Sequence, residues 1–269
     1  MSQPLIAQSE TVTQPIIPWP GGKRRLAQHL LPLFPNHHTY VEAFAGGGAL
    51  LFLRPEPAKS EVLNDINGDL VNLYRVVQHH LDEFMRQFRW ALTSRQLFKW
   101  AQAQAPETLT DIQRAARFFY LQKLAFGSKV ASQTFGVDPR GTARFNLLRL
   151  EEDLSEAHLR LASVVIECLP WEACVARYDR PETLFFFDPP YWQTEGYGVG
   201  FGREQYDRLA ATMKGMKGRA ILTVNDHPDM RQAFKGFRVR RLTTRYTIGH
   251  SAASKAAQRG EIVVLSDGV

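Results

Sequence analysis

The sequence predicts an α/β fold built on a doubly wound, mostly parallel sheet that is interrupted by a helical insertion. Two observations support this prediction. Short strands alternate with helices on both sides of a long middle region whose apolar spacing is mainly helical. Glycine- and proline-rich segments follow two of these strands directly, which is typical of ligand-binding loops at the carboxyl edge of a parallel sheet.

The first predicted strand and helix flank a glycine-rich loop. Residues Thr39 to Phe44 are rich in β-branched and aromatic side chains, which favour a strand. They run into Gly46-Gly47-Gly48 and then an apolar helix over 49–54, which Pro55 ends. Because a second strand is predicted over 60–63, the order strand, glycine loop, helix, strand matches the opening of a doubly wound sheet.

The middle of the chain has a different pattern. Apolar residues recur at helical spacing from 69 to 105, and a further helix is predicted over 111–126. Turn residues are frequent from 128 to 146, and β-type residues at 134–135 and 143–145 predict a hairpin near 129–146. This region also carries many basic side chains. We therefore predict a separate helical domain over residues 68–155.

Alternation of helices and strands resumes after the insertion. A helix to about residue 161 precedes a predicted strand over 163–168, and the most apolar strand of the chain, over 184–187, precedes Asp188. The other predicted elements are helices over 24–33, 171–177, 203–213 and 230–234 and strands over 219–224, 237–243 and 261–265. We expect residues 1–67 and 156–269 to form one discontinuous catalytic domain.

Composition and charge narrow the class of protein. The formal net charge is +6 and the pI about 9.4, which favours a polyanionic partner without proving one. No run of about 18 apolar residues is present, so we expect no transmembrane segment. The polar first 14 residues do not have the zones of a secretory signal. Cys168 and Cys174 lack a neighbouring His or Cys cluster, so we expect no metal site and a cytoplasmic location.

The loop from Glu42 to Gly48 is the first candidate binding site. Glycines between a strand and a helix let the backbone turn tightly and approach a ligand closely. Asp65 ends the next strand, near the spacing of about 20 residues at which an acidic residue binds ribose hydroxyls. No Lys-Ser or Lys-Thr follows the glycines, which argues against a triphosphate-binding loop. The pattern indicates a nucleotide-type cofactor, with a structural turn and a helix-capping Asp65 as the alternative.

Asp188-Pro189-Pro190-Tyr191 is the second candidate site. Two prolines after a strand stiffen the backbone and remove two N–H groups, so the Asp188 side chain and the Pro189 carbonyl become fixed acceptors. The lone pair of an amino group on an aromatic ring is delocalised, and two acceptors on its N–H bonds would localise that pair in the transition state. Tyr191 offers a face on which an extruded base can stack. A turn with Asp188 as a helix cap is the alternative interpretation.

A third motif, Trp19-Pro20-Gly21-Gly22-Lys23, places an aromatic ring, a turn and a cation ahead of a helix. Together with the glycine loop, Asp65 and the Asp188 motif, it resembles the Dam-type (alpha-class) family of DNA adenine N6-methyltransferases over about residues 15–266. The resemblance implies a Rossmann-like methyltransferase sheet, S-adenosylmethionine as cofactor and double-stranded DNA as partner. It also implies direct methyl transfer to the amino group of a flipped adenine, with residues 68–155 as a target-recognition domain.

The resemblance further implies a role for each matched residue. The residues expected to close over the methionine end of the cofactor are Trp19, Gly21, Gly22 and Lys23. Those expected to line or support its pocket are Glu42, Phe44, Gly46 and Gly48. Its ribose hydroxyls would bind Asp65, and its adenine would pack against Ile66 and Trp171. The segment from Asp188 to Tyr191 would hold the target base, and Asp188 would also reach the cofactor.

The predicted DNA contacts lie in the insertion and near the carboxyl terminus. Arg reads guanine and Asn reads adenine in the major groove, so the candidates for base contacts are Arg140, Arg144 and Asn146. The candidates for phosphate contacts are Lys129, Lys255 and Arg259. The hairpin and the loop after Tyr191 depart from the family pattern, so the recognition sequence, and whether it is strict, is not predicted. We expect a monomer.

Other activities would use the same motifs. The same acceptor pair suits the amino group of cytosine, or of a base in RNA, or the side-chain amide of a protein glutamine. A relative that lost catalysis could bind DNA only, although the intact Asp188, Pro189 and Tyr191 argue against this. The Gly-Gly-Lys segment and the basic insertion favour adenine in DNA.

Overall fold

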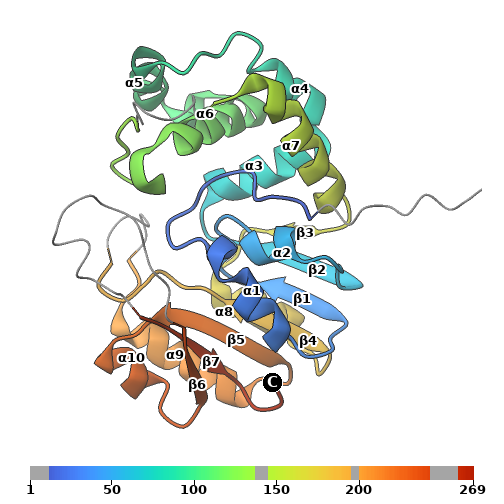
Figure 1. The fold of residues 1–269 in the computed structure, drawn as a ribbon, viewed down its shortest axis with the longest axis vertical. Helices are drawn as coiled ribbons and strands as arrows, with labels where there is room; N and C mark the ends of the chain where they lie inside the picture. The colour runs from blue at the N-terminus through green and yellow to red at the C-terminus, as the bar shows by residue number, and fades with distance from the viewer. Residues whose placement is uncertain (1–11, 137–144, 195–199, 243–259) are drawn as a thin grey trace, which may run out of the picture.

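A computed structural model describes residues 12–136, 145–194, 200–242 and 260–269 (Figure 1). Its centre is a seven-stranded sheet in the order β3-β2-β1-β4-β5-β7-β6. The strands are β1 (Thr39–Glu42), β2 (Ser60–Asn64), β3 (Val165–Glu167), β4 (Thr183–Phe187), β5 (Arg219–Asn225), β6 (Arg238–Leu242) and β7 (Glu261–Leu265).

Most neighbouring strands are parallel. β1 lies between β2 and β4 in parallel register, with Val41 opposite both Val62 and Phe185. β3 and β5 extend the parallel part on either side, whereas β7 runs antiparallel between β5 and β6. The predicted α/β fold with a mostly parallel, doubly wound sheet is confirmed. Because the strand order reverses between β1 and β4, the crevice for a ligand is expected at the carboxyl ends of these two strands.

Helices cover both faces of the sheet because side chains alternate along each strand. On one face, Phe185 and Phe187 of β4 pack with α8 (Trp171–Tyr178), α9 (Arg203–Gly215) and α10 (Pro228–Ala233). On the other, Leu184 and Phe186 pack in a core shared with the first helices. Those elements are η1 (Lys23–Arg25), α1 (Ala27–Leu30), η2 (Leu31–Leu33) and α2 (Ala49–Leu53).

The helical insertion lies above the sheet in the view of Figure 1, away from α8–α10. Its elements are α3 (Gly68–His79), α4 (Leu81–Arg86), α5 (Arg95–Ala103), η3 (Pro106–Thr108), α6 (Asp111–Leu124), η4 (Phe126–Ser128) and α7 (Leu147–Leu161). Aromatic contacts hold it together, since the ring of Phe119 lies 5.6 Å from that of Phe84 and 5.4 Å from that of Phe88. A capping box of Thr110 and Gln113 starts α6.

Several elements differ from their predicted form. The helix predicted over 24–33 is three short pieces, and Pro32 lies in the first turn of the last one. The helix α7 continues through residue 155, where a domain boundary was predicted. Phe135 forms an antiparallel bridge with Ala125, while most of the predicted hairpin lies outside the described residues. No helix in the described part of the chain is long and apolar enough to cross a membrane.

Candidate active site

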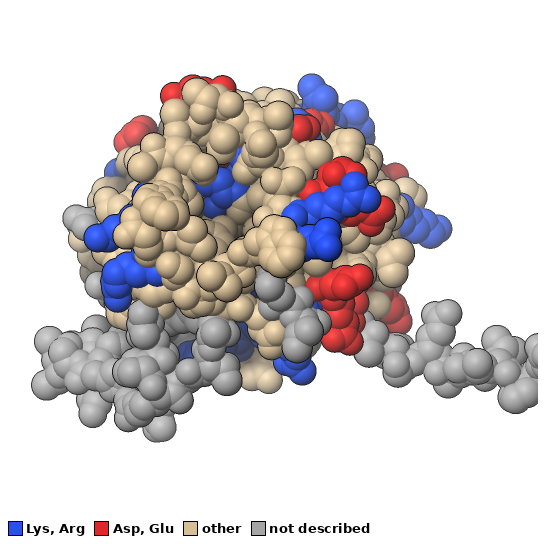
Figure 2. All heavy atoms as spheres, turned by 90° about the horizontal axis from the view of Figure 1, so that it is seen from above, with Lys and Arg blue, Asp and Glu red and all other residues tan. Residues whose placement is uncertain are grey.

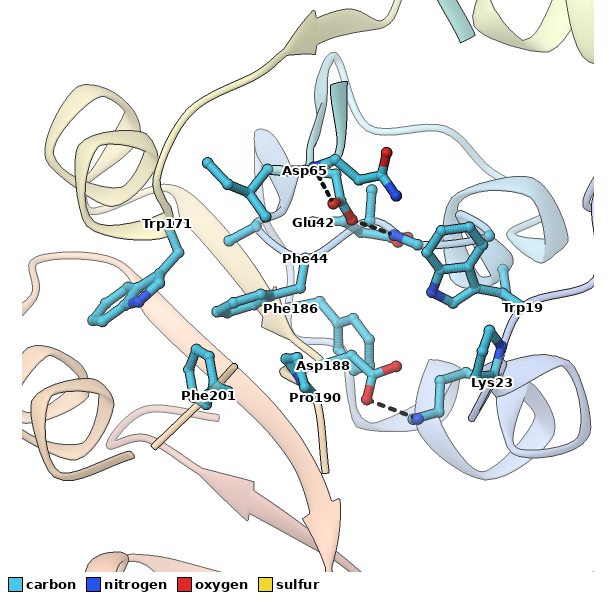
Figure 3. A pocket seen from close by; sticks show the side chains of 18 of the residues that line it. Trp19, Lys23, Glu42, Phe44, Asp65, Trp171, Phe186, Asp188, Pro190 and Phe201 are labelled. Atoms are coloured by element: carbon cyan, nitrogen blue, oxygen red, sulfur yellow. Dashed lines mark hydrogen bonds and ion pairs between the residues drawn. The ribbon is translucent and has the colours of Figure 1, made fainter. Parts of the chain in front are cut away.

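A cavity of about 370 Å³ opens at the carboxyl ends of β1, β2 and β4, where the strand order reverses. Trp19 and Lys23 lie at one end, and Trp171 and Phe201 at the other (Figure 3). The predicted site residues that line it are Trp19, Gly22, Lys23, Glu42, Phe44, Gly46, Asp65, Ile66, Trp171, Asp188 and Pro190. Segments more than 150 residues apart in sequence therefore meet at one edge of the sheet.

The glycine loop has two different requirements for glycine. Gly46 has a φ of +48°, and a Cβ there would lie 2.5 Å from Nε1 of Trp19, so the indole packs directly on this backbone. Gly48 has a φ of +61° and is the N-cap of α2, where a Cβ would lie 3.1 Å from the Phe52 ring. Gly48 shapes the turn but does not line the cavity, in contrast to its predicted place in the pocket lining.

Asp65 joins the end of β2 to the glycine loop. Its Oδ2 accepts a hydrogen bond of 2.9 Å from the Gly46 N–H, and its Oδ1 accepts one of 2.9 Å from the Asn67 N–H (Figure 3). Tyr74 donates its hydroxyl to the Gly46 carbonyl at 2.7 Å. A carboxylate has about four lone-pair sites, so Asp65 keeps acceptor capacity toward the cavity.

An aromatic wall closes the far end of the cavity. The Phe44 ring lies 6.4 Å from the Trp171 ring and 5.6 Å from that of Phe201. Trp171 begins α8 and donates its indole N–H to Gln205 at 3.1 Å, which fixes its orientation. Ile66 is 52% exposed beside this wall. Sequence reasoning missed Phe201 and Gln205, since the sequence around them carries no recognisable motif.

Asn64 is a second residue that sequence reasoning missed. Its buried amide donates to the carbonyls of Ala43 and Leu169 at 3.0 Å each and accepts from the Leu169 N–H at 2.9 Å. These bonds tie β1 and β2 to the segment that leads into Trp171. Its place at the end of β2, directly before Asp65, was the available signal.

Asp188 follows β4 and meets a buried lysine. Its Oδ1 accepts a hydrogen bond of 2.8 Å from the Thr223 hydroxyl and lies 2.7 Å from Nζ of Lys23 (Figure 3). Lys23 is 2% exposed, donates to the Gly21 carbonyl at 2.7 Å and forms a second ion pair of 3.2 Å with Glu261. Lys23 therefore lies on the Asp188 side of the cavity. The Gly21 carbonyl accepts one of its hydrogen bonds.

The segment after Asp188 is held by contacts with α9, Lys23 and β5. The Pro190 carbonyl accepts a hydrogen bond from the Tyr206 hydroxyl, and the Tyr191 ring centroid lies 4.8 Å from Nζ of Lys23. Asn225 both accepts from the Trp192 N–H at 3.0 Å and donates to its carbonyl at 3.1 Å. Pro189 and Tyr191 do not line the cavity itself.

Two carboxyl groups in this region, Glu42 and Glu261, are buried, and Asp188 is partly buried. Burial raises the pKa of Asp188 above its usual value, although the Lys23 ammonium and the Thr223 hydroxyl oppose the rise. Burial raises the pKa of Glu261 to about 6 and that of Glu42 to about 7. Glu42 is held by the Tyr40 hydroxyl at 3.0 Å and the Leu51 N–H at 2.8 Å.

We expect Glu42→Gln to reduce the loss of stability that accompanies a rise in pH. The Glu42 pKa is raised from 4.5 to about 7, so its contribution to stability is full below pH 4.5 and is lost as the pH rises through 7. That difference corresponds to about 3 kcal/mol. Glutamine retains the accepting oxygen. Urea unfolding at pH 5 and pH 8 measures the effect, and exposed Glu56→Gln is the control. An unchanged pH dependence in Glu42→Gln would contradict the expected burial effect.

The residues predicted to contact DNA are only partly described. Lys129 and Asn146 are exposed, whereas Arg140, Arg144, Lys255 and Arg259 lie outside the described residues. Seen from above, the surface has interspersed basic and acidic side chains on the right, while the coloured side chains at its lower left are basic (Figure 2). Within the described ranges, no group of three or more His, Cys, Asp or Glu side chains could hold a metal ion.

Comparison with known proteins places the chain in a family. The chain is 25% identical over 230 residues to a type II methyltransferase of Paramecium bursaria Chlorella virus NC1A, covering 83% of this chain and 87% of that one. It is 26% identical over 286 residues to a type II methyltransferase of Lactococcus lactis subsp. cremoris, covering 96% of each. It is 24% identical over 271 residues to a DNA adenine methylase of Haemophilus influenzae, covering 93% of each. A family profile matches residues 19–248, and the chain therefore belongs to the D12 class N6 adenine-specific DNA methyltransferases.

Proposed function

We propose that the cavity binds S-adenosylmethionine and that the enzyme transfers its methyl group to an adenine amino group at Asp188. The observation that carries this proposal is the single cavity shared by the glycine loop, Asp65 and Asp188. Its volume of about 370 Å³ falls in the range of small-molecule sites. The close packing of Trp19 on Gly46 and the spare acceptor capacity of Asp65 fit a nucleoside with a polar tail.

Different parts of the cavity would bind different parts of the cofactor. Phe44, Trp171 and Phe201 would hold the cofactor's adenine, and Asp65 its ribose hydroxyls. Trp19 and the backbone of Gly46 would enclose the methionine end. Bound in this way, S-adenosylmethionine would supply an electrophilic methyl group next to Asp188.

The target adenine would be held by the segment from Asp188 to Tyr191. The Asp188 carboxylate and the Pro189 carbonyl would accept the two N–H bonds of the amino group, which localises its lone pair as the methyl group arrives. Tyr191 would stack on the base. Because this site lies at a sheet edge, the adenine must leave the duplex to reach it. The family acts on DNA, and we propose double-stranded DNA as the form that is bound.

We propose residues 68–155 as the target-recognition domain, with Lys129 and Asn146 among its DNA contacts. Support comes from their exposure and from the way the insertion stands apart from α8–α10 (Figure 1). The remaining predicted contacts are proposed on sequence alone: Arg140, Arg144, Lys255 and Arg259. We further propose that a monomer acts in the bacterial cytoplasm, because that is where bacterial DNA is present.

Labelled methyl transfer tests this proposal. Purified protein is incubated with methyl-tritiated S-adenosylmethionine and unmethylated double-stranded DNA, and the DNA is digested to nucleosides for chromatography. We expect the label in N6-methyl-2′-deoxyadenosine and a faster rate than on the separated strands. Label in N4-methylcytosine alone, or label on RNA or protein but not on DNA, would reject it.

A further inference from the structure

Glu261 is a buried carboxylate that the proposed reaction does not use. It is the first residue of β7, pairs with Asn225 and Leu242 in the sheet, and is 1% exposed. Among the described residues, neither of its carboxylate oxygens has a hydrogen bond of good geometry. Its ionic partner is Lys23, whose Nζ lies 3.2 Å from Oε1. Burying a charged carboxylate destabilises a protein unless a partner compensates it.

Lys23 therefore stands between two carboxylates. Its ammonium lies 2.7 Å from Oδ1 of Asp188 and 3.2 Å from Oε1 of Glu261, and it donates to the Gly21 carbonyl at 2.7 Å. An ammonium has three N–H donors and here has three oxygen neighbours, of which Glu261 contributes an ion pair rather than a well-aligned hydrogen bond. With all three side chains charged, the cluster has a net charge of −1 rather than the zero of an isolated Lys23–Asp188 pair.

This surplus negative charge affects the reacting amino group. A carboxylate neutralised by a close ammonium is a weaker acceptor, because the ammonium withdraws its charge. The amino nitrogen becomes positively charged as it takes up a methyl group. A site with a net negative charge stabilises that transition state more than a neutral site does.

We propose that Glu261 is a positioning residue that holds the Lys23 ammonium and offsets its charge, so that Asp188 remains a strong acceptor for the adenine amino group. The proposal rests on the proposed function of Asp188. It requires no proton transfer through Glu261. Its effect is electrostatic and passes through Lys23 and Asp188.

The charges that face Glu261 set the expected pH dependence. They are Lys23, which lowers the pKa of Glu261, and Asp188, which raises it. Asp188 in turn interacts electrostatically with Glu42 on β1, and the Tyr191 ring centroid lies 4.8 Å from Nζ of Lys23. Removing the negative charge of Glu261 lowers the pKa of Asp188, since a like charge is lost. The acid limb of the rate profile then moves to lower pH.

Glu261→Gln tests the proposal because it keeps the shape of the side chain and removes its charge. We expect kcat to fall roughly 10- to 100-fold, KM for S-adenosylmethionine and DNA to stay within about twofold, and the acid limb to move to lower pH. Glu261→Asp retains the charge and should keep an acid limb close to that of the wild type. The matched control is Glu167→Gln, at the end of β3 with Tyr178 and Arg177 as its partners. A kcat and an acid limb that both equal those of the wild type would overturn the proposal.

A measurement without turnover separates this inference from the proposed function. Carbon-13 NMR of labelled aspartate carboxyls follows the Asp188 titration in the wild type and in Glu261→Gln, with Asp188→Asn used for assignment. We expect the apparent pKa of Asp188 to be lower in Glu261→Gln. An unchanged pKa would reject the role of Glu261 even if the wild type methylates adenine. A lowered pKa in a protein that transfers no methyl group would instead reject the proposed function.

Discussion

Replacing Asp188 with alanine or asparagine is expected to abolish methyl transfer while DNA binding survives. Asp188 is the charged acceptor of the site and lies 2.7 Å from Lys23. Removing one group that stabilises transition-state charge lowers kcat by about 10²- to 10³-fold. The expected loss is at least that large, because asparagine has no negative charge to stabilise the developing charge on the amino nitrogen. Single-turnover transfer of a tritiated methyl group measures the effect.

Two controls make this result specific. Asp207→Asn removes an exposed carboxylate on α9 that pairs with Arg203 four residues away, so its activity should equal that of the wild type. DNA binding by fluorescence anisotropy should differ little between the wild type and Asp188→Asn. Transfer by Asp188→Asn at a rate near that of the wild type would refute the proposed role of Asp188.

Gly46→Ala is expected to weaken cofactor binding strongly without unfolding the protein. The new Cβ would lie 2.5 Å from Nε1 of Trp19, and the φ of +48° disfavours any side chain. Strain of this kind is worth about 1–3 kcal/mol, which corresponds to roughly 5- to 150-fold in affinity if Trp19 moves into the cavity. Calorimetric titration with S-adenosylhomocysteine measures it.

Gly215→Ala is the matched control for this substitution. Gly215 is the last residue of α9, and apart from its chain neighbours and the backbone of its own helix no atom lies within 4 Å of the position of its Cβ. We expect its affinity for the cofactor to be unchanged. Equal affinity in Gly46→Ala and the wild type would show that the loop does not form the cofactor site.

The sequence predicted the parts of the fold that depend on local patterns. The strand that ends before the glycine loop is rich in β-branched and aromatic residues, and the one that ends before Asp188 is a short apolar run. Both were recognisable because turn residues follow them. Their parallel pairing then brings Asp188 to the same sheet edge as Gly46 and Asp65. The main features of the candidate site therefore follow from sequence.

Contacts across long sequence separations could not be predicted. No local pattern shows that β7 inserts antiparallel between β5 and β6, which brings Glu261 to within 3.2 Å of Lys23, more than 200 residues earlier in the chain. The places of Phe201 and Gln205 at the aromatic end of the cavity could not be predicted for the same reason. Gly48 was misplaced because a glycine that caps a helix and one that faces a ligand look alike in sequence.

The central claim is that the enzyme methylates the amino group of adenine in DNA, with the cofactor bound in this cavity and Asp188 as the acceptor for the amino group. Single-molecule sequencing of DNA from methylase-deficient bacteria that express either the wild type or Asp188→Asn tests it most directly. We expect N6-methyladenine in cells with the wild type, at sites that reveal its recognition sequence, and none in cells with Asp188→Asn. N4-methylcytosine in place of N6-methyladenine, or equal adenine methylation in both strains, would contradict it.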